Sequence, residues 1–423
     1  MDSIESVAGP LVNGKYLHWD DLLHRKPPGN LTREEWWWGL KFRRDSAAKT
    51  VPLEAKSKGG NFKFVEVDPI QEKLHYITLQ SGGHVAMPEQ ITNPETKDQY
   101  YVSSLIEEAI TSSQLEGAAT TRQVASEMIR SGRKPRDNSE QMILNNYITM
   151  KTIGELKDQP LTKKLVFKIH RLITEQTLND PSAAGRFRKE SDGKIYIVDD
   201  RNEPLHFPPP TAELDSRMDA MCKFANDSSS SPFIHPVLRS IILHFWLAYD
   251  HPFVDGNGRT ARALFYWSML HHDYWLFEFV SISKIILKGP SKYSLAFLHT
   301  ETDDNDLTYF ILYHLDVIHR AIEELYAHLR KQTQNFHEVE KALRGAAGLN
   351  HRQKALIEHA LRHPHYRYTF ASHRTSHNIA YQTARTDILD LVKRGYLETA
   401  GKEGRRHYYA PATDLGKRLK KLD

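Results

Sequence analysis

A short glycine-containing polar segment, residues 251–262, is flanked by two helix-length apolar segments. The preceding segment, 237–249, is long and mainly apolar, and Pro236 stands where its first helical turn would be, a position that proline favours. The following segment runs from about Thr260 to Leu270. The pattern therefore predicts two apolar helices that hold a polar loop between them, the usual place for a functional site.

The chain around this core, residues 96–345, is mostly helical in pattern. Apolar residues recur at helical spacing in two further segments. The first contains Val102, Leu105, Ile106 and Ala109, and the second contains Leu165, Ile169, Leu172 and Ile173. Thr162 is the expected N-cap of the second. The exception is the β-branched and aromatic run Ile195, Tyr196, Ile197 and Val198. A polar turn and then three prolines follow it. We therefore predict a mainly α fold with one β-hairpin.

Two other regions flank this helical body. Residues 1–95 are mixed: Thr32 and Glu35 have the spacing of a capping box, so Trp36, Trp37 and Trp38 are expected to open a helix and to pack into the core. Residues 62–79 in the same region predict two short strands around Asp68 and Pro69. Residues 346–423 predict three helices, at 352–361, 372–379 and 380–394, and then a hairpin around 401–404. This order is that of a winged helix-turn-helix.

Composition restricts the kind of protein. The 423 residues are 40% hydrophobic and 26% charged, contain no apolar run long enough to span a membrane, and begin with an acidic segment unlike a secretory signal. Cys222 is the single cysteine, which excludes a disulfide framework or a thiolate zinc site within one chain. We expect a soluble, cytoplasmic protein with no membrane contact, and the sequence leaves open whether it forms a homodimer.

Positive charge is concentrated at the C-terminal end. Residues 351–423 contain 15 Lys and Arg against 7 Asp and Glu, a net charge of +8, whereas the whole chain carries +4. In a winged helix, Arg385 would lie on the recognition helix, and Lys402, Arg405 and Arg406 would lie on the wing near phosphates. DNA contact and protein docking both stay open here, because winged helices do both.

The polar loop combines residue types that suit phosphate chemistry. His251 follows a predicted helix end, and a neutral histidine can accept a proton near pH 7. Asp255 supplies a hard oxygen ligand for Mg²⁺. Gly256, Asn257 and Gly258 let backbone N–H groups approach a phosphate at the N-terminus of the next helix. The loop alone therefore predicts a Mg²⁺–polyphosphate site beside a general base.

Two arginines complete this segment. Arg259 and Arg262 are three residues apart on one helix face and can hold phosphate oxygens bidentately. With them, the segment matches at each defined position the Fic signature His-x-Phe-x-(Asp/Glu)-Gly-Asn-Gly-Arg-x-x-Arg. The chain thus resembles the Fic-domain protein adenylyltransferases over about residues 96–330. The resemblance implies transfer of AMP from ATP to a hydroxyl group of a protein, with Mg²⁺ as the cofactor.

The resemblance also assigns roles within the site. His251 would be the general base, Asp255 would hold Mg²⁺, and Tyr293 would lie near the adenine. The other residues would hold the phosphates: Gly256, Asn257 and Gly258 as an anion hole, Arg259 at the α- or β-phosphate, and Arg262 at the γ-phosphate. The Doc-type branch of the family carries lysine at the position of Gly258.

A second motif, Ser112 to Gly117, resembles the family's inhibitory pattern (Ser/Thr)-x-x-x-Glu-(Gly/Asn). Glu116 would pair with Arg262 in the ATP cleft, so that ATP binds with its α-phosphate misaligned. The predicted hairpin at 195–198 resembles the flap that aligns the target by strand addition. The resemblance therefore implies an autoinhibited enzyme whose target is another protein or itself.

Two further functions stay open. One is a DNA-binding regulator whose Fic domain senses a nucleotide or modifies only itself. The other is an enzyme that removes AMP, with Glu116 positioning a water molecule. The intact His251 and Asp255 favour the transferase, because a pure sensor could lose the base.

Overall fold

The chain is described by a computed structural model in several stretches, at residues 7, 9–55, 60–82, 94–193, 197–198, 204–227, 232–345, 348–364, 366–403 and 406–419. It divides into two compact units, Met1–Glu323 and Glu324–Asp423. The regions predicted from sequence, 1–95, 96–345 and 346–423, stay a prediction. Within the described residues, every helix is too short or too polar to cross a membrane.

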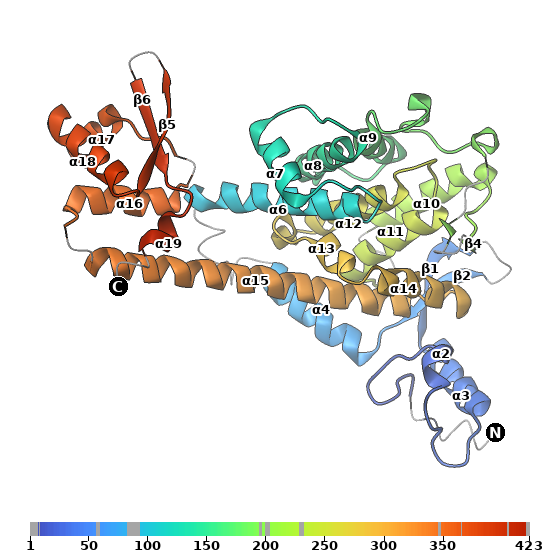
Figure 1. The fold of residues 1–423 in the computed structure, drawn as a ribbon. Coiled ribbons are helices and arrows are strands. Elements are labelled where there is room, and N and C mark those ends of the chain that lie inside the picture. The colour runs from blue at the N-terminus through green and yellow to red at the C-terminus, as the bar shows by residue number, and fades with distance from the viewer. Residues whose placement is uncertain are drawn as a thin grey trace. The chain divides into compact units, whose positions relative to one another are not determined.

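The first unit is built mainly from helices (Figure 1). In chain order they are α2 (Trp19–Leu22), α3 (Arg33–Ser46), α4 (Asp68–Ser81), α6 (Pro94–Gln114), α7 (Arg122–Ser131), α8 (Asn138–Leu156), α9 (Lys163–Thr174), α10 (Leu214–Asn226), α11 (Pro236–Asp250), α12 (Asn257–His271), α13 (Ile282–Leu287), α14 (Pro290–Thr302) and the start of α15 (Thr308–Gly345). Short 3₁₀ turns lie at Pro181–Ala183, Glu190–Asp192, Thr211–Glu213 and Trp275–Glu278. Antiparallel pairs join β1 (Ala48–Glu54) to β2 (Asn61–Val65) and β3 (Ile197–Val198) to β4 (Pro204–His206). The unit is mainly α, as predicted.

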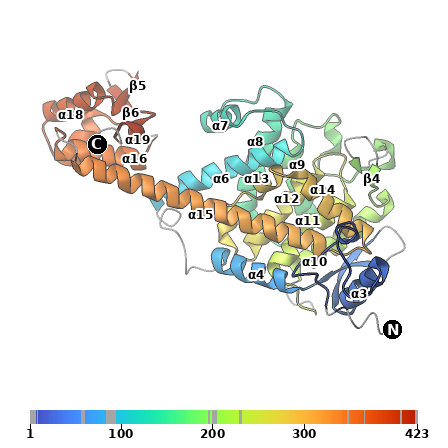
Figure 2. The same ribbon diagram turned by 60° about the horizontal axis from the view of Figure 1, so that its bottom comes forward.

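Helices α11 and α12 pack against each other in the interior of this unit, with α10 against α11 and with α6, α8 and α9 against α12 (Figures 1 and 2). Trp246 of α11 and Trp267 of α12 are at most 1% exposed. Pro236 opens α11 as predicted, because the N–H that proline lacks has no helical partner at that position. The loop 251–256 is thus fixed at both ends by buried helices.

Local signals set several helix starts where they were predicted. Thr32 Oγ1 accepts from the Glu35 N–H at 3.1 Å, and Glu35 Oε2 accepts from the Thr32 N–H at 2.8 Å, which is a reciprocal capping box on α3. Thr162 caps α9 by accepting from the N–H three residues further on at 3.2 Å. Helix α12 begins at Asn257, three residues earlier than predicted, with Gly256 as its N-cap at φ 80°.

The prediction of two strands in residues 62–79 is wrong in its second half. The first strand exists as β2, but the remainder is α4, with Pro69 in its first turn. Ile70, Leu74 and Ile77 recur at helical spacing and are at most 4% exposed. The segment is a helix because its apolar residues recur at helical spacing; the loose alternation of apolar and polar residues did not indicate a second strand.

The tryptophans of α3 are only partly core residues. Trp36 is 6% exposed, whereas Trp38 is 69% exposed. The predicted core role therefore holds for Trp36 and is wrong for Trp38. Consecutive residues of a helix point about 100° apart, so three in a row cannot all face one core.

The second unit contains the end of α15, then α16 (His351–Arg362), α17 (Phe370–His377), α18 (Tyr381–Lys393), the antiparallel strands β5 (Leu397–Glu403) and β6 (Arg406–Pro411), and α19 (Leu415–Leu419) (Figure 1). Asp387 of α18 organises this unit. It accepts from Arg352 Nε at 2.7 Å and from Asn350 Nδ2 at 2.8 Å, and it lies 3.2 Å from His373 Nε2. The order of three helices followed by a hairpin is the predicted one.

Candidate active site

The loop between α11 and α12 is closed by its own hydrogen bonds. Asn257 Oδ1 accepts from the Phe253 N–H at 2.9 Å, and Asn257 Nδ2 donates to the Phe253 carbonyl at 2.8 Å. The Phe253 side chain is fully buried. The side-chain amide of Asn257 therefore shapes the loop, and a contribution of Asn257 to the predicted anion hole would come from its backbone N–H.

His251, the predicted general base, is half-buried at the C-cap of α11. Its Nδ1 lies 3.4 Å from the Ala248 carbonyl oxygen, which can only accept, so Nδ1 carries the proton and Nε2 keeps a free lone pair. Burial lowers the pKa of His251 to about 4, although the Ala248 carbonyl and Glu116 act to raise it. His251 is therefore neutral at pH 7 and can accept a proton at Nε2.

His170 of α9 supports the loop from behind. Its ring stacks on Phe253 with centroids 3.8 Å apart. The Gly185 N–H donates to His170 Nδ1 at 2.8 Å, so Nε2 carries the proton and donates to the Asp255 carbonyl at 2.9 Å. Sequence analysis missed this residue. The available signal was its position three residues before the predicted core residue Ile173, on the buried face of α9.

Arg188 holds the start of the loop. Its Nε donates to the His251 carbonyl at 2.8 Å, and its backbone N–H donates to the Pro252 carbonyl at 2.8 Å. Its Nη2 also donates to the Pro209 carbonyl, at the end of the segment that follows β4. Arg188 therefore fixes the backbone of the predicted base, a role that the sequence pattern did not indicate.

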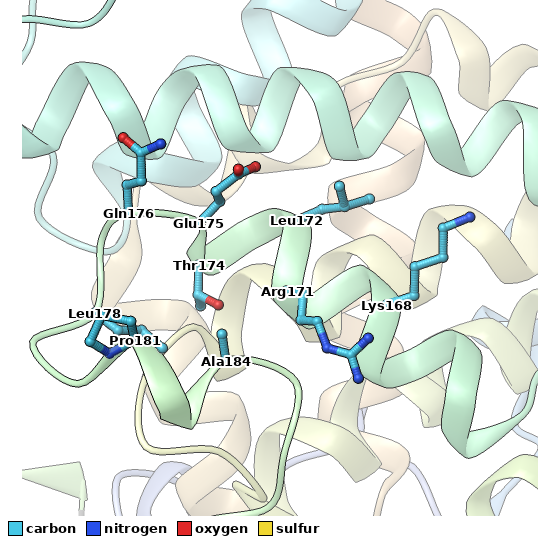
Figure 3. A pocket seen from close by; sticks show the side chains of 9 residues that line it. All are labelled: Lys168, Arg171, Leu172, Thr174, Glu175, Gln176, Leu178, Pro181 and Ala184. Carbon is cyan, nitrogen blue, oxygen red and sulfur yellow. The ribbon is translucent and has the colours of Figure 1, made fainter.

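A cavity of about 480 Å³ lies at the C-terminal end of α9, and Thr174 is one of the residues that line it (Figure 3). Thr174 also packs behind the loop, because a Cβ placed on Gly256 would lie only 2.7 Å from Thr174 Cγ2. The exposed cations Lys168 and Arg171 line the cavity. Its described lining includes no residue of the signature, so it is a separate feature from the loop.

Arg259 and Asp255 face each other across the first turn of α12. Arg259 is 1% exposed and donates from Nη1 to the Ile173 carbonyl at 3.2 Å, but its Nε finds no hydrogen-bond partner among the residues that the structure describes. Asp255 Oδ2 lies 3.7 Å from Arg259 Nη2, and the Asp255 side chain is 56% exposed. Burial lowers the pKa of Arg259, yet a guanidinium stays charged near pH 7. A buried cation with an unused N–H can bind an anion.

Arg262 is bound by the predicted inhibitory motif. Its Nε donates to Ser112 Oγ at 2.8 Å, and its Nη2 donates to the Ser112 carbonyl at 2.9 Å and to Glu116 Oε1 at 2.8 Å. Burial alone would lower the pKa of Arg262, but Glu116 outweighs it and the pKa is raised. Burial likewise acts to raise the pKa of Glu116, but Arg262 holds it below its usual value. The two groups therefore form an ion pair at pH 7.

The Glu116 carboxylate also lies against the first turn of α12. A Cβ placed on Gly258 would collide with Glu116 Oε1. The N-terminus of a helix carries partial positive charge and attracts anions. The carboxylate therefore sits where the same charge would attract a phosphate, and Gly258 provides the space for it.

Glu108, two turns before Glu116, anchors the helix that leads to the inhibitory motif. Glu108 Oε2 accepts from Tyr266 Oη at 2.8 Å, from Ser281 Oγ at 2.7 Å and from the Ser283 N–H at 3.2 Å. The side chain is 2% exposed, and burial raises its pKa. Sequence analysis missed it, although its neighbour Ala109 stands in the predicted apolar stripe of this helix.

Tyr293 of α14 lies near Arg262. Its hydroxyl is 2.8 Å from His244 Nε2. Burial raises the pKa of Tyr293 to about 12, against the opposing effect of the Arg262 charge. That Tyr293 contacts adenine stays a prediction.

The predicted flap is only partly described. Ile195 and Tyr196 lie outside the described residues. Ile197 and Val198 form β3, and Ile197 pairs with His206 of β4. A hairpin is therefore present at the predicted place, whereas its role with a target is not tested by this pairing.

The predicted nucleic-acid residues belong to the second unit. Arg385 is exposed on α18, and Lys402 is exposed on β5. Arg406 begins β6, whereas Arg405 and the side chain of Arg406 lie outside the described part of the chain.

Residues 160–269 match the family model described as Fic/DOC family. The matched stretch contains α9, both strands of the hairpin, α11, the loop and most of α12. This part of the chain is therefore a Fic domain, as the signature predicts.

Curated relatives share part of this chain. A protein from Nematostella vectensis named Protein adenylyltransferase Fic is 28% identical over 204 residues, which is 47% of this chain and 43% of the relative. A protein of the same name from Drosophila melanogaster is 33% identical over 124 residues, which is 29% of this chain and 23% of the relative. The chain thus matches less than half the length of each.

A solved structure shares the fold. The crystal structure of a Fic family protein from Desulfovibrio desulfuricans G20 aligns with a TM-score of 0.54. The alignment covers 83% of this chain and 98% of that chain at 17% identity. At this identity the likeness concerns the fold.

Proposed function

We propose that this protein is a Mg²⁺-dependent adenylyltransferase that moves AMP from ATP to a hydroxyl group of another protein or of itself. The observation that carries the proposal is the complete signature on one fixed loop and the first turns of α12, which supply a neutral His251 with a free Nε2 and the buried cation Arg259. The names of the curated relatives support the same activity. A nucleotide sensor needs the anion site but no base, so His251 favours an enzyme over the alternative of a DNA-binding regulator.

The proposed reaction needs one base and one anion site. His251 Nε2 takes the proton of the target hydroxyl while the hydroxyl oxygen bonds to the α-phosphorus. The bond between the α-phosphorus and the bridging oxygen of the β-phosphate breaks, and pyrophosphate leaves. Backbone N–H groups at the start of α12, including that of Gly258, stabilise the charge on the transferred phosphoryl group. Arg259 and Arg262 hold the other phosphate oxygens.

Asp255 is the residue that we propose for Mg²⁺. Its side chain is 56% exposed, and its Oδ1 accepts the Gly256 N–H, so the carboxylate is oriented while an oxygen stays accessible. Mg²⁺, when bound, neutralises charge on the α- and β-phosphates.

Glu116 supports a proposal of autoinhibition. It holds Arg262, the arginine proposed for the γ-phosphate, in an ion pair of 2.8 Å. It also places negative charge against Gly258, where a phosphate would be attracted. ATP can then bind only with a misplaced triphosphate, and removal of this carboxylate should restore alignment.

The hairpin β3–β4 is proposed as the flap that orients the target. A two-stranded sheet has edges to which an extended segment of another protein can add by backbone hydrogen bonds. Its position in the chain, between α9 and α10 and ahead of the helix pair α11–α12, supports this role.

The second unit is proposed to be a winged helix-turn-helix that docks DNA or protein. The net charge of residues 351–423, and the exposure of Arg385 and Lys402, support contact with DNA phosphates. Arg385→Ala and Lys402→Ala should each weaken duplex binding more than Lys417→Ala, a matched loss of one exposed charge, and binding should fall steeply with salt. If no duplex binds near physiological salt, the unit is a protein-docking module.

The compartment that we propose is the cytoplasm. Cys222 is the single cysteine and is buried, and burial raises the pKa of its thiol to about 12. A chain without disulfides needs no oxidising compartment.

The test of the function uses ATP labelled at the α-phosphate together with Mg²⁺. Label should appear on protein with Glu116→Gly and should be absent with Glu116→Gly combined with His251→Ala. Equal labelling of the two variants would contradict the role of His251. If neither variant labels protein but the parent releases AMP from a protein that already carries it, the enzyme that removes AMP is the better description.

A further inference from the structure

Away from the loop, three side chains from distant parts of the first unit meet at the start of α2. His18 is the N-cap of α2, Asp20 lies in its first turn, and His299 lies on α14. Asp20 Oδ2 is 3.3 Å from His18 Nδ1 and 3.9 Å from His299 Nε2. One ligand atom from each residue lies within 4.8 Å of the other two. The imidazole side chains are only 8% and 12% exposed, so water competes poorly for them.

The hydrogen bonds around His18 indicate which ring nitrogen carries a proton. Thr302 Oγ1 donates to the Leu298 carbonyl at 2.6 Å, so it faces His18 Nε2, 3.5 Å away, as an acceptor. On the other side of the ring, the Asp20 N–H donates to His18 Nδ1 at 3.3 Å. His18 therefore carries its proton on Nε2, and the lone pair of Nδ1 accepts the Asp20 N–H as the cap of α2. An ion bound at Nδ1 would replace this one capping hydrogen bond.

The charges around His299 favour a cation as well. The exposed carboxylates of Asp20 and Asp21 act on this ring, and so does Asp303, which is also paired with Lys41 at 2.8 Å. A neutral imidazole and an ionised carboxylate are the forms that bind metal ions.

We propose that His18, Asp20 and His299 bind one divalent transition-metal ion of the Zn²⁺ class. Two imidazole nitrogens and one carboxylate oxygen suit such ions, with metal–ligand distances of about 2.0–2.2 Å. The two rings stack 3.9 Å apart and 9° from parallel, so binding tilts one ring to direct both lone pairs at the ion.

The remaining coordination position would face a cavity. A space of about 540 Å³ is lined by His18 and Asp20 together with Trp19, Trp37 and Trp38. A three-ligand site beside a cavity can take water or a small oxygen or nitrogen ligand in its fourth position. The exposed Trp38, which does not serve the core, would then form part of the wall around that position.

An ion here would join residues 18–20 to α14, the helix that also carries Tyr293. A ligand that binds only the folded protein stabilises it by mass action. At a free ion concentration 100-fold above the dissociation constant, the melting temperature of the chain should rise by on the order of 5 °C. The inference does not rest on the proposed transferase activity, because binding is measured without ATP.

The test is a titration of the full chain with Co²⁺ at pH 7.5, followed by the visible absorption of the ion and by displacement with Zn²⁺. The parent should bind one equivalent through this site, with a spectrum typical of mixed nitrogen and oxygen ligands. Asp20→Asn keeps the fold, since the side chain is 67% exposed, and should weaken Co²⁺ binding at least tenfold. His299→Gln should weaken it on the order of 100-fold or more.

Two matched controls separate this site from other ligands. His24→Ala removes an exposed histidine six residues from His18, and Asp255→Ala removes the proposed Mg²⁺ ligand. Both should leave the spectrum and the Zn²⁺-dependent rise in melting temperature unchanged. If the parent binds Co²⁺ no better than the combined Asp20→Asn and His299→Gln variant, the cluster is a histidine–aspartate pair that holds only a proton, and the proposal is wrong.

Discussion

Replacing Glu116 by glycine removes one carboxylate from the site without disturbing a helix, because Glu116 follows the end of α6 at Gln114. Arg262 loses its ion pair of 2.8 Å but keeps both hydrogen bonds to Ser112, at 2.8 and 2.9 Å. Arg262 therefore loses its ionic partner but keeps two hydrogen-bond acceptors. The expected loss in the free energy of unfolding is about 1–3 kcal/mol, the cost of one charge-assisted hydrogen bond.

The same interaction sets the expected gain in activity. If the ion pair must break before Arg262 can hold the γ-phosphate, its net strength adds to the barrier of transfer. A hydrogen bond between charged groups contributes about 1.5–3 kcal/mol, and each 1.4 kcal/mol of barrier changes a rate about tenfold. Because the Glu116 side chain is 27% exposed, we expect the lower part of that range. Transfer of AMP should thus rise about 10- to 30-fold in Glu116→Gly.

The assay is the initial rate of labelling at saturating ATP, with melting curves recorded for each variant. Glu107→Gln is the matched control, because Glu107 lies on the same helix and pairs with Arg122 instead. In Glu116→Gly combined with Arg262→Ala the gain should vanish, since the released arginine carries it. Equal rates in the parent and in Glu116→Gly, with both proteins folded, would refute the reasoning and leave Glu116 as the end of a helix.

Three further predictions concern the base and the anchor of the inhibitory helix. His251→Ala in the released background should lower transfer by about 10²–10⁴-fold while ATP binding changes only a few-fold, which calorimetry would check. The pKa of His251 is lowered to about 4, so the rate at low substrate concentration should stay level from pH 7.5 to 5.5. Below pH 4 it should fall about tenfold per pH unit. A histidine base with the ordinary pKa would already lose activity below pH 6.5. Glu108→Gln should turn an amide toward the hydrogen-bond donors of Tyr266, Ser281 and Ser283 and loosen α6. Labelling should rise, but less than in Glu116→Gly. If labelling is unchanged while the melting temperature clearly drops, Glu108 contributes to stability alone.

The sequence predicted the helix pair and the loop because their signals are local. Pro236 and Thr162 act within one turn of the helix starts that they set, and the spacing of the signature residues is contiguous. The same reasoning failed where two periods compete over a short segment. Ile70 and Leu74 fit helical spacing, yet the loose alternation nearby favoured a strand until burial decided for the helix.

What the sequence could not provide were partners that meet only in three dimensions. Arg188 binds the His251 carbonyl across 63 positions of the chain, and Arg262 binds Ser112 across 150. The family resemblance predicted that Arg262 meets Glu116, 146 positions away, but not its bonds to Ser112, and nothing near Arg188 indicates which carbonyl it will meet. Asn257 shows the converse: its place in the signature suggests a ligand contact, but its side chain closes the loop on Phe253.

Gly258 restricts how a chain of this kind can change over generations. Any side chain added there would collide with the Glu116 carboxylate, which would then have to turn away from the start of α12. One substitution at position 258 would thus weaken the proposed restraint while His251 and Asp255 stay in place. A descendant chain that carries a side chain at this position is therefore expected to need another means of regulating its activity.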